Sequence, residues 1–367
     1  MRTKFKIELP IDVLQMNKVF KSKGFELFVV GGAVRDALLG IKPKDFDLAT
    51  NAEPDIVEEI MRMGGFKTLA TGKAFGVINV FAGANEFEVA TFRKDIGIGR
   101  RPDSVEFTTI EGDVQRRDLT CNALFYDIET EEIVDLVGGI EDIKNGVVKT
   151  VGSAKDRFNE DRLRILRAIR FAGRFNCDLD KDIIDVLKND NSLEGISGER
   201  IHDEFIKGVK TAESIKHFLE MIEDFKLFDW IFPDLKIENW VPNTNDPILI
   251  VSMLLHKNDT STLGKKLNEL KFSSNDVKDI VFLISLQKIN VDSITEFKKN
   301  QKRTNLTDGQ IIFFATMFGI SFDFMLKFIN FELSVDGEFV MEKFGIKAGR
   351  ELGEKIKMLE IENFLKL

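Results

Sequence analysis

The sequence is poor in cysteine, histidine and tyrosine, and it contains no long apolar run. Its 367 residues include 2 cysteines, 3 histidines and 1 tyrosine. Cys121 and Cys177 cannot build a disulfide framework or a four-thiolate zinc site. No stretch of roughly 18 apolar residues predicts a membrane span, and the first residues lack the apolar core of a signal peptide. We therefore expect a cytoplasmic protein with no membrane association and no disulfide partner.

The sequence also lacks an excess of positive charge, because the formal net charge is −9. An acidic total argues against a general nucleic-acid coating protein, although it permits a local basic groove. His202 and Asp203 could suggest a metal phosphohydrolase dyad, but such a site needs several further His and Asp ligands. Only His217 and His256 remain, so we interpret the dyad as incidental. No sequence feature specifies an oligomeric state.

Two kinds of hydrophobic pattern divide the chain. The first 150 residues predict mixed α/β structure, and the pattern becomes helical from Asp156 onwards. We therefore expect an α+β protein, with a sheet-containing domain at residues 1–150 and an all-helical remainder. Strands are expected at 25–30 and 46–50, hairpins at 77–91 and 124–136, and helices at 33–39, 54–63, 212–225, 248–255 and 277–286.

The first chemical signal is a diglycine turn followed by two carboxylates. Gly31 and Gly32 precede Arg35, and Asp45 and Asp47 follow. Carboxylates at i and i+2 of a strand point to the same side, which suits Mg²⁺ because this ion takes few protein carboxylates and binds substrate phosphates. The diglycine lets the backbone approach a phosphate, and Arg35 could bind a triphosphate oxygen. An isolated pair of acids is more often a solvated strand end, and the upstream turn weakens that alternative.

The second signal is the run Arg116, Arg117 and Asp118. Two arginines can bind a triphosphate through bidentate hydrogen bonds, and an aspartate can accept a hydrogen bond from a ribose hydroxyl. A surface cluster of salt bridges is the alternative for such a run.

The third signal lies at residues 160–170, which we interpret as one helix. Asp161 and Arg164 are three residues apart and so are neighbours on one face. Asp161 offers a hydrogen-bond acceptor and Arg164 offers donors. Together they match the pairing edges of cytosine and adenine, which present an amino group beside a ring nitrogen acceptor. Uracil and guanine present the reverse arrangement, so this pair would reject them. The alternative is an ordinary salt bridge on an exposed helix. Residues 155–175 carry seven positive and three negative charges, which favours an anionic ligand there.

The three motifs together resemble those of the class II tRNA nucleotidyltransferase and bacterial poly(A) polymerase family. The resemblance rests on VVGGAVRDALLGIKPKDFDLAT, RRDLTCNA and FNEDRLRILRAIRFAGRF, and it is specific over residues 25–205. It implies a polymerase-beta-like nucleotidyltransferase head with a mixed sheet at 1–150. A helical neck with the base-reading helix would follow at 151–210, and a helical body and tail that bind tRNA at 211–367.

The resemblance also implies roles for individual residues. Asp45 and Asp47 match the catalytic ligands of Mg²⁺ in a two-metal nucleotidyl transfer. Asp161 and Arg164 match the residues that read the base. The remaining nucleotide-binding positions, some of which contact ribose or RNA phosphate, are Gly32, Arg35, Arg116, Arg117, Asp118, Arg167 and Arg170.

The expected activity is the addition of C, C and A to the 3′ end of tRNA, with CTP and ATP as substrates. Glu88 is a candidate third carboxylate, and an ordinary charged residue of an edge strand is the equal alternative. Residues 94–101 match the family's flexible loop but are short and lack its usual Tyr, so a CC-only enzyme remains an alternative. A poly(A) polymerase, which shares the motifs, and an inactive nucleotide- or RNA-binding module also remain open.

Overall fold

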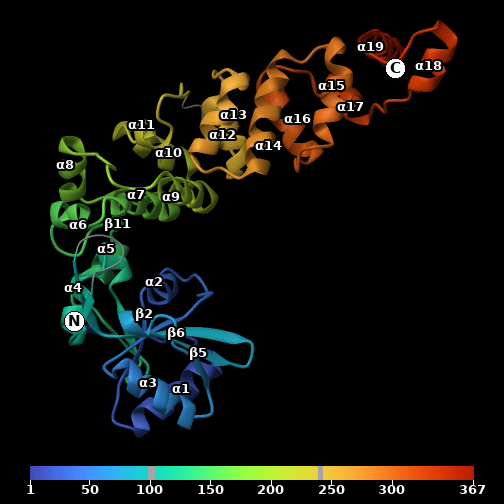
Figure 1. The fold of residues 1–367 in the computed structure, drawn as a ribbon. Helices are drawn as coiled ribbons and strands as arrows, with labels where there is room; N and C mark the ends of the chain where they lie inside the picture. The colour runs from blue at the N-terminus through green and yellow to red at the C-terminus, as the bar shows by residue number, and fades with distance from the viewer. Residues whose placement is uncertain (98–103, 239–242) are drawn as a thin grey trace. The chain divides into compact units, whose positions relative to one another are not determined.

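A computed structural model describes residues 1–97, 104–238 and 243–367 (Figure 1). The chain forms two compact units, each described here by itself. The first comprises Met1–Ile196 and Ala212–Ser214, and the second comprises Ser197–Thr211 and Ile215–Leu367. The predicted α+β class is confirmed, since a mixed sheet occupies the first unit and helices make up the second. The first unit contains the whole of the predicted head together with residues 151–196.

An eight-stranded sheet forms the framework of the first unit, with the order β1-β10-β9-β2-β3-β6-β5-β4. Its described strand pairs are antiparallel except β3 with β6, which is parallel and places Leu48 opposite Val89. Both predicted hairpins are present. The strands are β1 (Arg2–Lys4), β2 (Leu27–Val30), β3 (Asp47–Thr50), β4 (Lys67–Leu69), β5 (Val77–Ala82), β6 (Asn85–Thr91), β9 (Phe125–Asp127) and β10 (Glu132–Val134).

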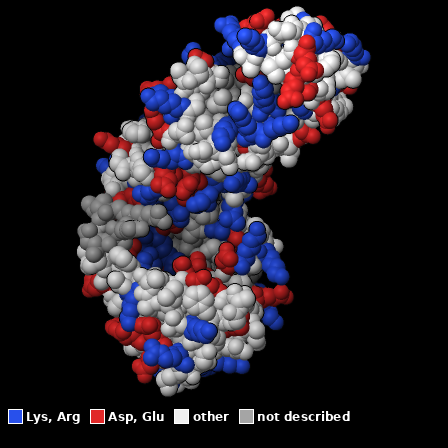
Figure 2. All heavy atoms as spheres, turned by 45° about the vertical axis from the view of Figure 1, so that its right-hand side comes forward, with Lys and Arg blue, Asp and Glu red and all other residues white. Residues whose placement is uncertain are grey.

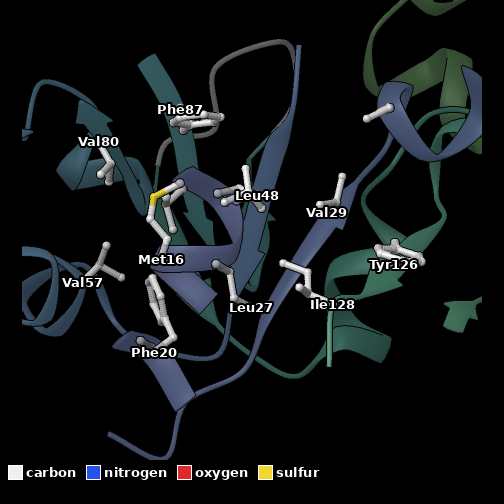
Figure 3. Close-up of a cluster of buried hydrophobic side chains, with 14 of the residues drawn as sticks. Met16, Phe20, Leu27, Val29, Leu48, Val57, Val80, Phe87, Tyr126 and Ile128 are labelled. Atoms are coloured by element: carbon white, nitrogen blue, oxygen red, sulfur yellow. The ribbon is translucent and has the colours of Figure 1, made fainter. Parts of the chain in front are cut away.

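The two faces of this sheet carry separate hydrophobic clusters. On one face, α1 (Ile11–Ser22) and α3 (Pro54–Met63) bury Met16, Phe20 and Val57 against the sheet (Figure 3). The other face carries a smaller cluster around Phe28 and Phe125. Side chains alternate between the faces of a strand, so β2, β3, β9 and β10 contribute to both clusters, whereas β5 and β6 contribute only to the larger one. The arginine motif lies on this second face, where fewer hydrophobic side chains cover the sheet and Arg117 packs on Phe125.

Short helices next to the sheet carry or flank the residues of the first two motifs. The helix α2 (Gly32–Leu38) follows β2 directly, and α4 (Ile110–Gln115) precedes the Arg116–Arg117 pair. A 3₁₀ turn, η2 (Thr120–Asn122), follows that pair. Two short strands, β7 (Arg93–Ile96) and β8 (Ser104–Phe107), form a separate hairpin. Of the loop expected at 94–101, residues 98–101 lie outside the described residues. The unit also contains α5 (Gly139–Lys144), α8 (Lys181–Asn189) and the parallel pair β11 (Val147–Val148) with β12 (Asp178–Leu179).

The prediction of one helix over residues 160–170 is wrong. The helix α6 (Ala154–Glu160) ends before Asp161, and α7 (Leu163–Phe175) begins after it. Asp161 is extended, with φ −151° and ψ 108°. Its Oδ1 accepts a hydrogen bond of 3.1 Å from the backbone N–H of Leu163. An aspartate side chain that bonds a nearby backbone N–H competes with helix continuation, which explains the break.

The described residues of the second unit form helices joined by loops, with no strand among them. The helix α12 is buried on all sides and packs against α9, α14 and α16. No described helix is long and apolar enough to cross a membrane. Basic and acidic side chains are interspersed over the visible surface (Figure 2). The helices are α9 (Gly198–Thr211), α10 (Ile215–Asp224), α11 (Phe228–Ile231), α12 (Pro247–Leu255), α13 (Thr260–Glu269), α14 (Ser274–Ser285), α15 (Ile294–Gln301), α16 (Asp308–Met317), α17 (Phe322–Asn330), α18 (Gly337–Phe344) and α19 (Arg350–Leu365).

Candidate active site

The two predicted metal ligands lie at the start of β3. Asp47 is the first residue of the strand and is paired with Val30 of β2, and Asp45 lies just before the strand. Both residues remain accessible to solvent, although the carboxyl group of Asp47 is partly buried, and Phe46 between them packs against the larger hydrophobic cluster. Phe46 and Asp47 therefore differ in burial as predicted, although the strand begins one residue later than expected.

Glu88 on β6 faces the same side of the sheet as Asp47. It lies one residue before Val89, the partner of Leu48, so Asp47 and Glu88 are neighbours across the parallel pair. Partial burial raises the pKa of Asp47, Arg117 opposes this shift, and the charge of Asp45 adds to it. Partial burial and the charge of Asp47 likewise raise the pKa of Glu88. Carboxylates that repel one another at a sheet surface form a site that a divalent cation would stabilise.

The described residues contain no group of three or more His, Cys, Asp or Glu side chains already arranged to hold a metal. The hard oxygen donors of Asp45 and Asp47 nevertheless fit an ion that takes few protein carboxylates. His202 packs against the ring of Phe272, with centroids 4.1 Å apart, and belongs to the second unit.

The diglycine turn lies against the arginine motif. Gly31 has φ +68°, a conformation that favours glycine, and its N–H donates to the carbonyl of Leu124 over 3.0 Å. A Cβ on Gly31 would lie 3.7 Å from Nη1 of Arg117. Gly32 is the first residue of α2. The turn therefore brings the N-terminus of α2 next to the guanidinium of Arg117.

Asp113 orients both arginines of the second motif, and the sequence analysis did not identify it. This residue of α4 is only 1% exposed. Its Oδ1 accepts from Nε of Arg116 at 2.8 Å, and its Oδ2 accepts from Nε and Nη2 of Arg117 at 3.1 and 2.9 Å. The guanidinium of Arg117 also lies 4.5 Å from the ring centroid of Phe125. The spacing of three and four residues between Asp113 and the arginines was the available signal.

The third motif contacts the second through one ion pair and one hydrogen bond to a backbone carbonyl. Arg167 donates from Nε and Nη2 to Oδ2 of Asp118, at 2.8 and 2.6 Å. Arg164 pairs with Glu160, and its Nη2 lies 3.4 Å from the carbonyl oxygen of Arg116. Arg164 also donates its backbone N–H to the carbonyl of Asp161 over 3.0 Å, so these two residues remain neighbours despite the helix break. The structure thus brings the ribose motif and the base-reading motif together.

Arg35 is buried beneath α7, although the resemblance implies that it contacts the nucleotide. Only 4% of the residue is exposed. Its guanidinium donates to Asp36 and Asn122, and it lies 5.0 Å from the ring centroids of both Phe171 and Phe175. Protein groups therefore surround Arg35. Arg170, also mostly buried, lies 4.4 Å from the ring centroid of Phe171.

This combination of a mixed sheet, paired carboxylates and an arginine-rich helix is that of a nucleotidyltransferase head domain. The family profile described as "Poly A polymerase head domain" matches residues 27–149. A second profile, "Probable RNA and SrmB- binding site of polymerase A", matches residues 185–238. The chain belongs to the class II family of CCA-adding enzymes, as its similarity to two members over almost its whole length shows.

Similarity to curated relatives extends over almost the whole chain. The CCA-adding enzyme of Ligilactobacillus salivarius is 32% identical, over 98% of this chain and 92% of that protein. The CCA-adding enzyme of Lactobacillus helveticus is 30% identical, over 95% of this chain and 91% of that protein. Poly(A) polymerase I of Haemophilus influenzae is also 32% identical, but over 61% of this chain and 52% of its own length.

Solved structures share the fold. The Bacillus stearothermophilus CCA-adding enzyme in complex with CTP aligns with a TM-score of 0.73 and 24% identity, over 96% of this chain and 92% of that one. The Thermotoga maritima CCA-adding enzyme complexed with tRNA aligns with a TM-score of 0.70 and 19% identity, over 98% and 92%.

Proposed function

We propose that this protein adds C, C and A to the 3′ end of tRNA from CTP and ATP without a nucleic-acid template. The observation that carries the proposal is the similarity to CCA-adding enzymes along 98% of the chain. The similarity to a poly(A) polymerase covers 61% of the chain, which favours tRNA over other RNA as the acceptor. We further propose that residues 211–367 bind the tRNA and that the protein is cytoplasmic.

The reaction is an in-line substitution at phosphorus. The 3′ hydroxyl of the tRNA attacks the α-phosphate of the nucleotide, and pyrophosphate leaves. Asp45 and Asp47 would hold Mg²⁺, with Glu88 close enough to add to the negative potential. When bound, Mg²⁺ would favour the attacking alkoxide and neutralise charge on the leaving triphosphate. The protein itself contributes the orientation of the two substrates.

Arg116 and Arg117 supply the positive charge that holds the triphosphate. Asp113 fixes both guanidinium groups before the nucleotide arrives, so little side-chain ordering remains to be done on binding. Arg116 contacts Asp113 through Nε, so its terminal nitrogens are the part that would meet phosphate oxygens. Nη1 of Arg117 also donates to the carbonyl of Asn122 at 3.3 Å, and a phosphate oxygen would share or replace that contact. Gly31 and Gly32 allow the triphosphate to approach the backbone closely next to Arg117.

Asp161 and Arg164 would select the base by offering one acceptor and one donor fork to its pairing edge. Asp118 would select ribonucleotides by accepting hydrogen bonds from the hydroxyl groups of the ribose. In the structure, Arg164 pairs with Glu160 and Asp118 pairs with Arg167. A bound nucleotide would therefore share these contacts or replace them. Each well-matched base contact would contribute about 1–3 kcal/mol of discrimination against the wrong base.

The direct test offers the purified protein a tRNA transcript that ends at the discriminator base, with one nucleotide at a time. Addition of two C residues from CTP, followed by one A after ATP is supplied, supports the proposal. Addition that stops at CC identifies the CC-only alternative, and a long A tract identifies a poly(A) polymerase. No addition of any nucleotide, with tRNA binding retained, identifies an inactive binding module.

A further inference from the structure

The helix α5 packs against the residues that follow Asp118, although it contributes no residue to the three motifs. Gly139, the first residue of α5, lies on the backbone of Thr120 in the turn η2. A Cβ at Gly139 would lie 2.3 Å from the carbonyl oxygen of Thr120 and 2.8 Å from its carbonyl carbon. Non-bonded atoms do not approach so closely, so only a glycine lets α5 and η2 pack at this distance.

A side-chain hydrogen bond connects the same two elements. Oγ1 of Thr120 donates to Oδ2 of Asp142, three residues further along α5, over 2.7 Å. Thr120 is only 2% exposed and Asp142 is half-buried, so water competes weakly for this bond. A hydrogen bond from a hydroxyl to a carboxylate is stronger than one between neutral groups. The contact therefore limits how far Thr120 can move relative to α5.

The N-terminus of α5 is itself fixed by the turn that precedes it. Asp135 is 4% exposed, and its carboxylate accepts from four successive backbone N–H groups, those of residues 137–140, over 2.8–3.1 Å. A buried carboxylate with four donors holds a turn in one conformation. Gly139 and Asp142 therefore offer Thr120 a rigid surface.

The segment that follows β11 also holds the second motif. The backbone N–H of Thr120 donates to the carbonyl of Lys149 over 2.9 Å, and the backbone N–H of Val151 donates to the carbonyl of Asp118 over 3.0 Å. Arg167 holds the carboxylate of Asp118. The contacts with α5 and with this segment thus fix the backbone from which that carboxylate projects.

We propose that α5 positions Asp118 for the selection of ribonucleotides over deoxyribonucleotides, through the Gly139 contact and the hydrogen bond between Asp142 and Thr120. A carboxylate discriminates by a hydroxyl only when its oxygen lies within about 3 Å of that hydroxyl, so a small shift of the backbone weakens the choice. Gly139 and Asp142 are positioning residues, because they act through Thr120 and Asp118. This inference rests on the proposed function, in which Asp118 accepts from the ribose.

The test measures kcat/KM for CTP and for dCTP on a tRNA that ends at the discriminator base, and compares their ratio between variants. Asp142→Ala and Thr120→Val remove the same hydrogen bond from its two sides. We expect each to lower the CTP/dCTP ratio at least about threefold, on the scale of one hydrogen bond, mainly through a lower kcat/KM for CTP. The double variant should fall no further than the worse single variant, because both changes break the same contact. Asp142→Asn keeps an acceptor and should keep the wild-type ratio.

Gly139→Ala tests the packing contact separately. The added Cβ forces α5 and Thr120 apart, because the atoms that it meets belong to the backbone. We expect this variant to lower both the thermal stability and the CTP/dCTP ratio. A wild-type ratio in folded Gly139→Ala would contradict the role of the close contact.

Two controls separate positioning from stability. Glu141→Ala is the matched control, because Glu141 is an exposed acid of α5 whose carboxylate accepts from Asn145, and this variant should keep the wild-type ratio. Phe20→Leu removes a buried ring from the larger hydrophobic cluster of the same unit. It should lose thermal stability and keep the CTP/dCTP ratio.

The outcomes of Asp142→Ala decide the inference. If α5 only stabilises the fold, Asp142→Ala will lower the thermal stability and leave the CTP/dCTP ratio unchanged, and this result overturns the inference. Equal use of CTP and dCTP by the wild-type protein also overturns it, because there is then no selection for α5 to support. Failure of the proposed function is distinguishable, because the wild-type protein would add neither nucleotide to tRNA and the inference would fall with it.

Discussion

Replacing Asp113 by Asn tests whether one buried carboxylate organises the triphosphate-binding arginines. Asp113 is 1% exposed and is the shared partner of Arg116 and Arg117, at 2.8 and 2.9 Å. Removing one partner of a buried ion pair costs about 3–5 kcal/mol because the other charge stays buried without compensation. The amide retains an acceptor, so we expect a loss near the lower end, about 3 kcal/mol, in the free energy of unfolding of the first unit.

The measurement is urea unfolding at pH 7, followed by the KM for CTP in tRNA extension. Asp55→Asn is the matched control, because Asp55 pairs with Lys73 at 2.6 Å but its side chain is 86% exposed. An exposed pair contributes about 1 kcal/mol or less. We expect the KM for CTP to rise in Asp113→Asn alone, since Arg116 and Arg117 lose their shared anchor. A loss of stability in Asp113→Asn no larger than in the control would refute the reasoning.

The same residue gives a prediction for pH. Burial alone would raise the pKa of Asp113, but Arg117 and Arg116 outweigh it and hold the pKa below the ordinary value of 3.8. The stabilisation from ionised Asp113 is therefore complete above pH 3.8, the unfolded value, and is lost as pH falls through the lower folded value. The difference in unfolding free energy between wild type and Asp113→Asn should stay constant from pH 8 to 5 and shrink below pH 4. A difference that grows on acidification would contradict the assignment.

Two further substitutions test the base-reading pair and the turn. Asp161→Ala or Arg164→Ala should relax or abolish the choice of C and A over U and G, by about 1–3 kcal/mol per lost contact. The measurement is kcat/KM with each nucleotide. Wild-type selectivity in both variants would end the idea of a protein template. Gly31→Ala should lower the free energy of unfolding by at least about 1–2 kcal/mol, because φ +68° with ψ −121° lies outside the regions open to an L residue, although the added Cβ would find ordinary contact distances. Unchanged thermal stability in that variant would show that the turn relaxes without cost.

Local patterns were sufficient to predict most individual elements. The helix expected at 54–63 coincides with α3. A proline marks its first residue, and a regular apolar face extends along its length. The alternation correctly separated Phe46, which packs in the larger hydrophobic cluster, from the solvent-accessible Asp47, since a period of two is a property of the strand alone.

Contacts between distant segments could not be predicted in this way. The parallel pairing of β3 with β6 makes Glu88 a neighbour of Asp47, and nothing local in either strand specifies it. The burial of Arg35 depends on two phenylalanines more than 130 positions away along the chain. The break at Asp161 was predictable in principle, because Asp favours the start of a helix, but the strong apolar pattern on both sides concealed it.

The central claim is that Asp45 and Asp47 carry the chemistry of nucleotide transfer, and Asp47→Ala tests it most directly. Incorporation of labelled CMP into tRNA and tRNA binding should be measured on the same preparation, with Glu59→Ala as the control. Glu59 is an exposed carboxylate on α3, which packs on the opposite face of the sheet. We predict that Asp47→Ala loses incorporation and retains tRNA binding, while Glu59→Ala retains both. Full incorporation by Asp47→Ala would contradict the account.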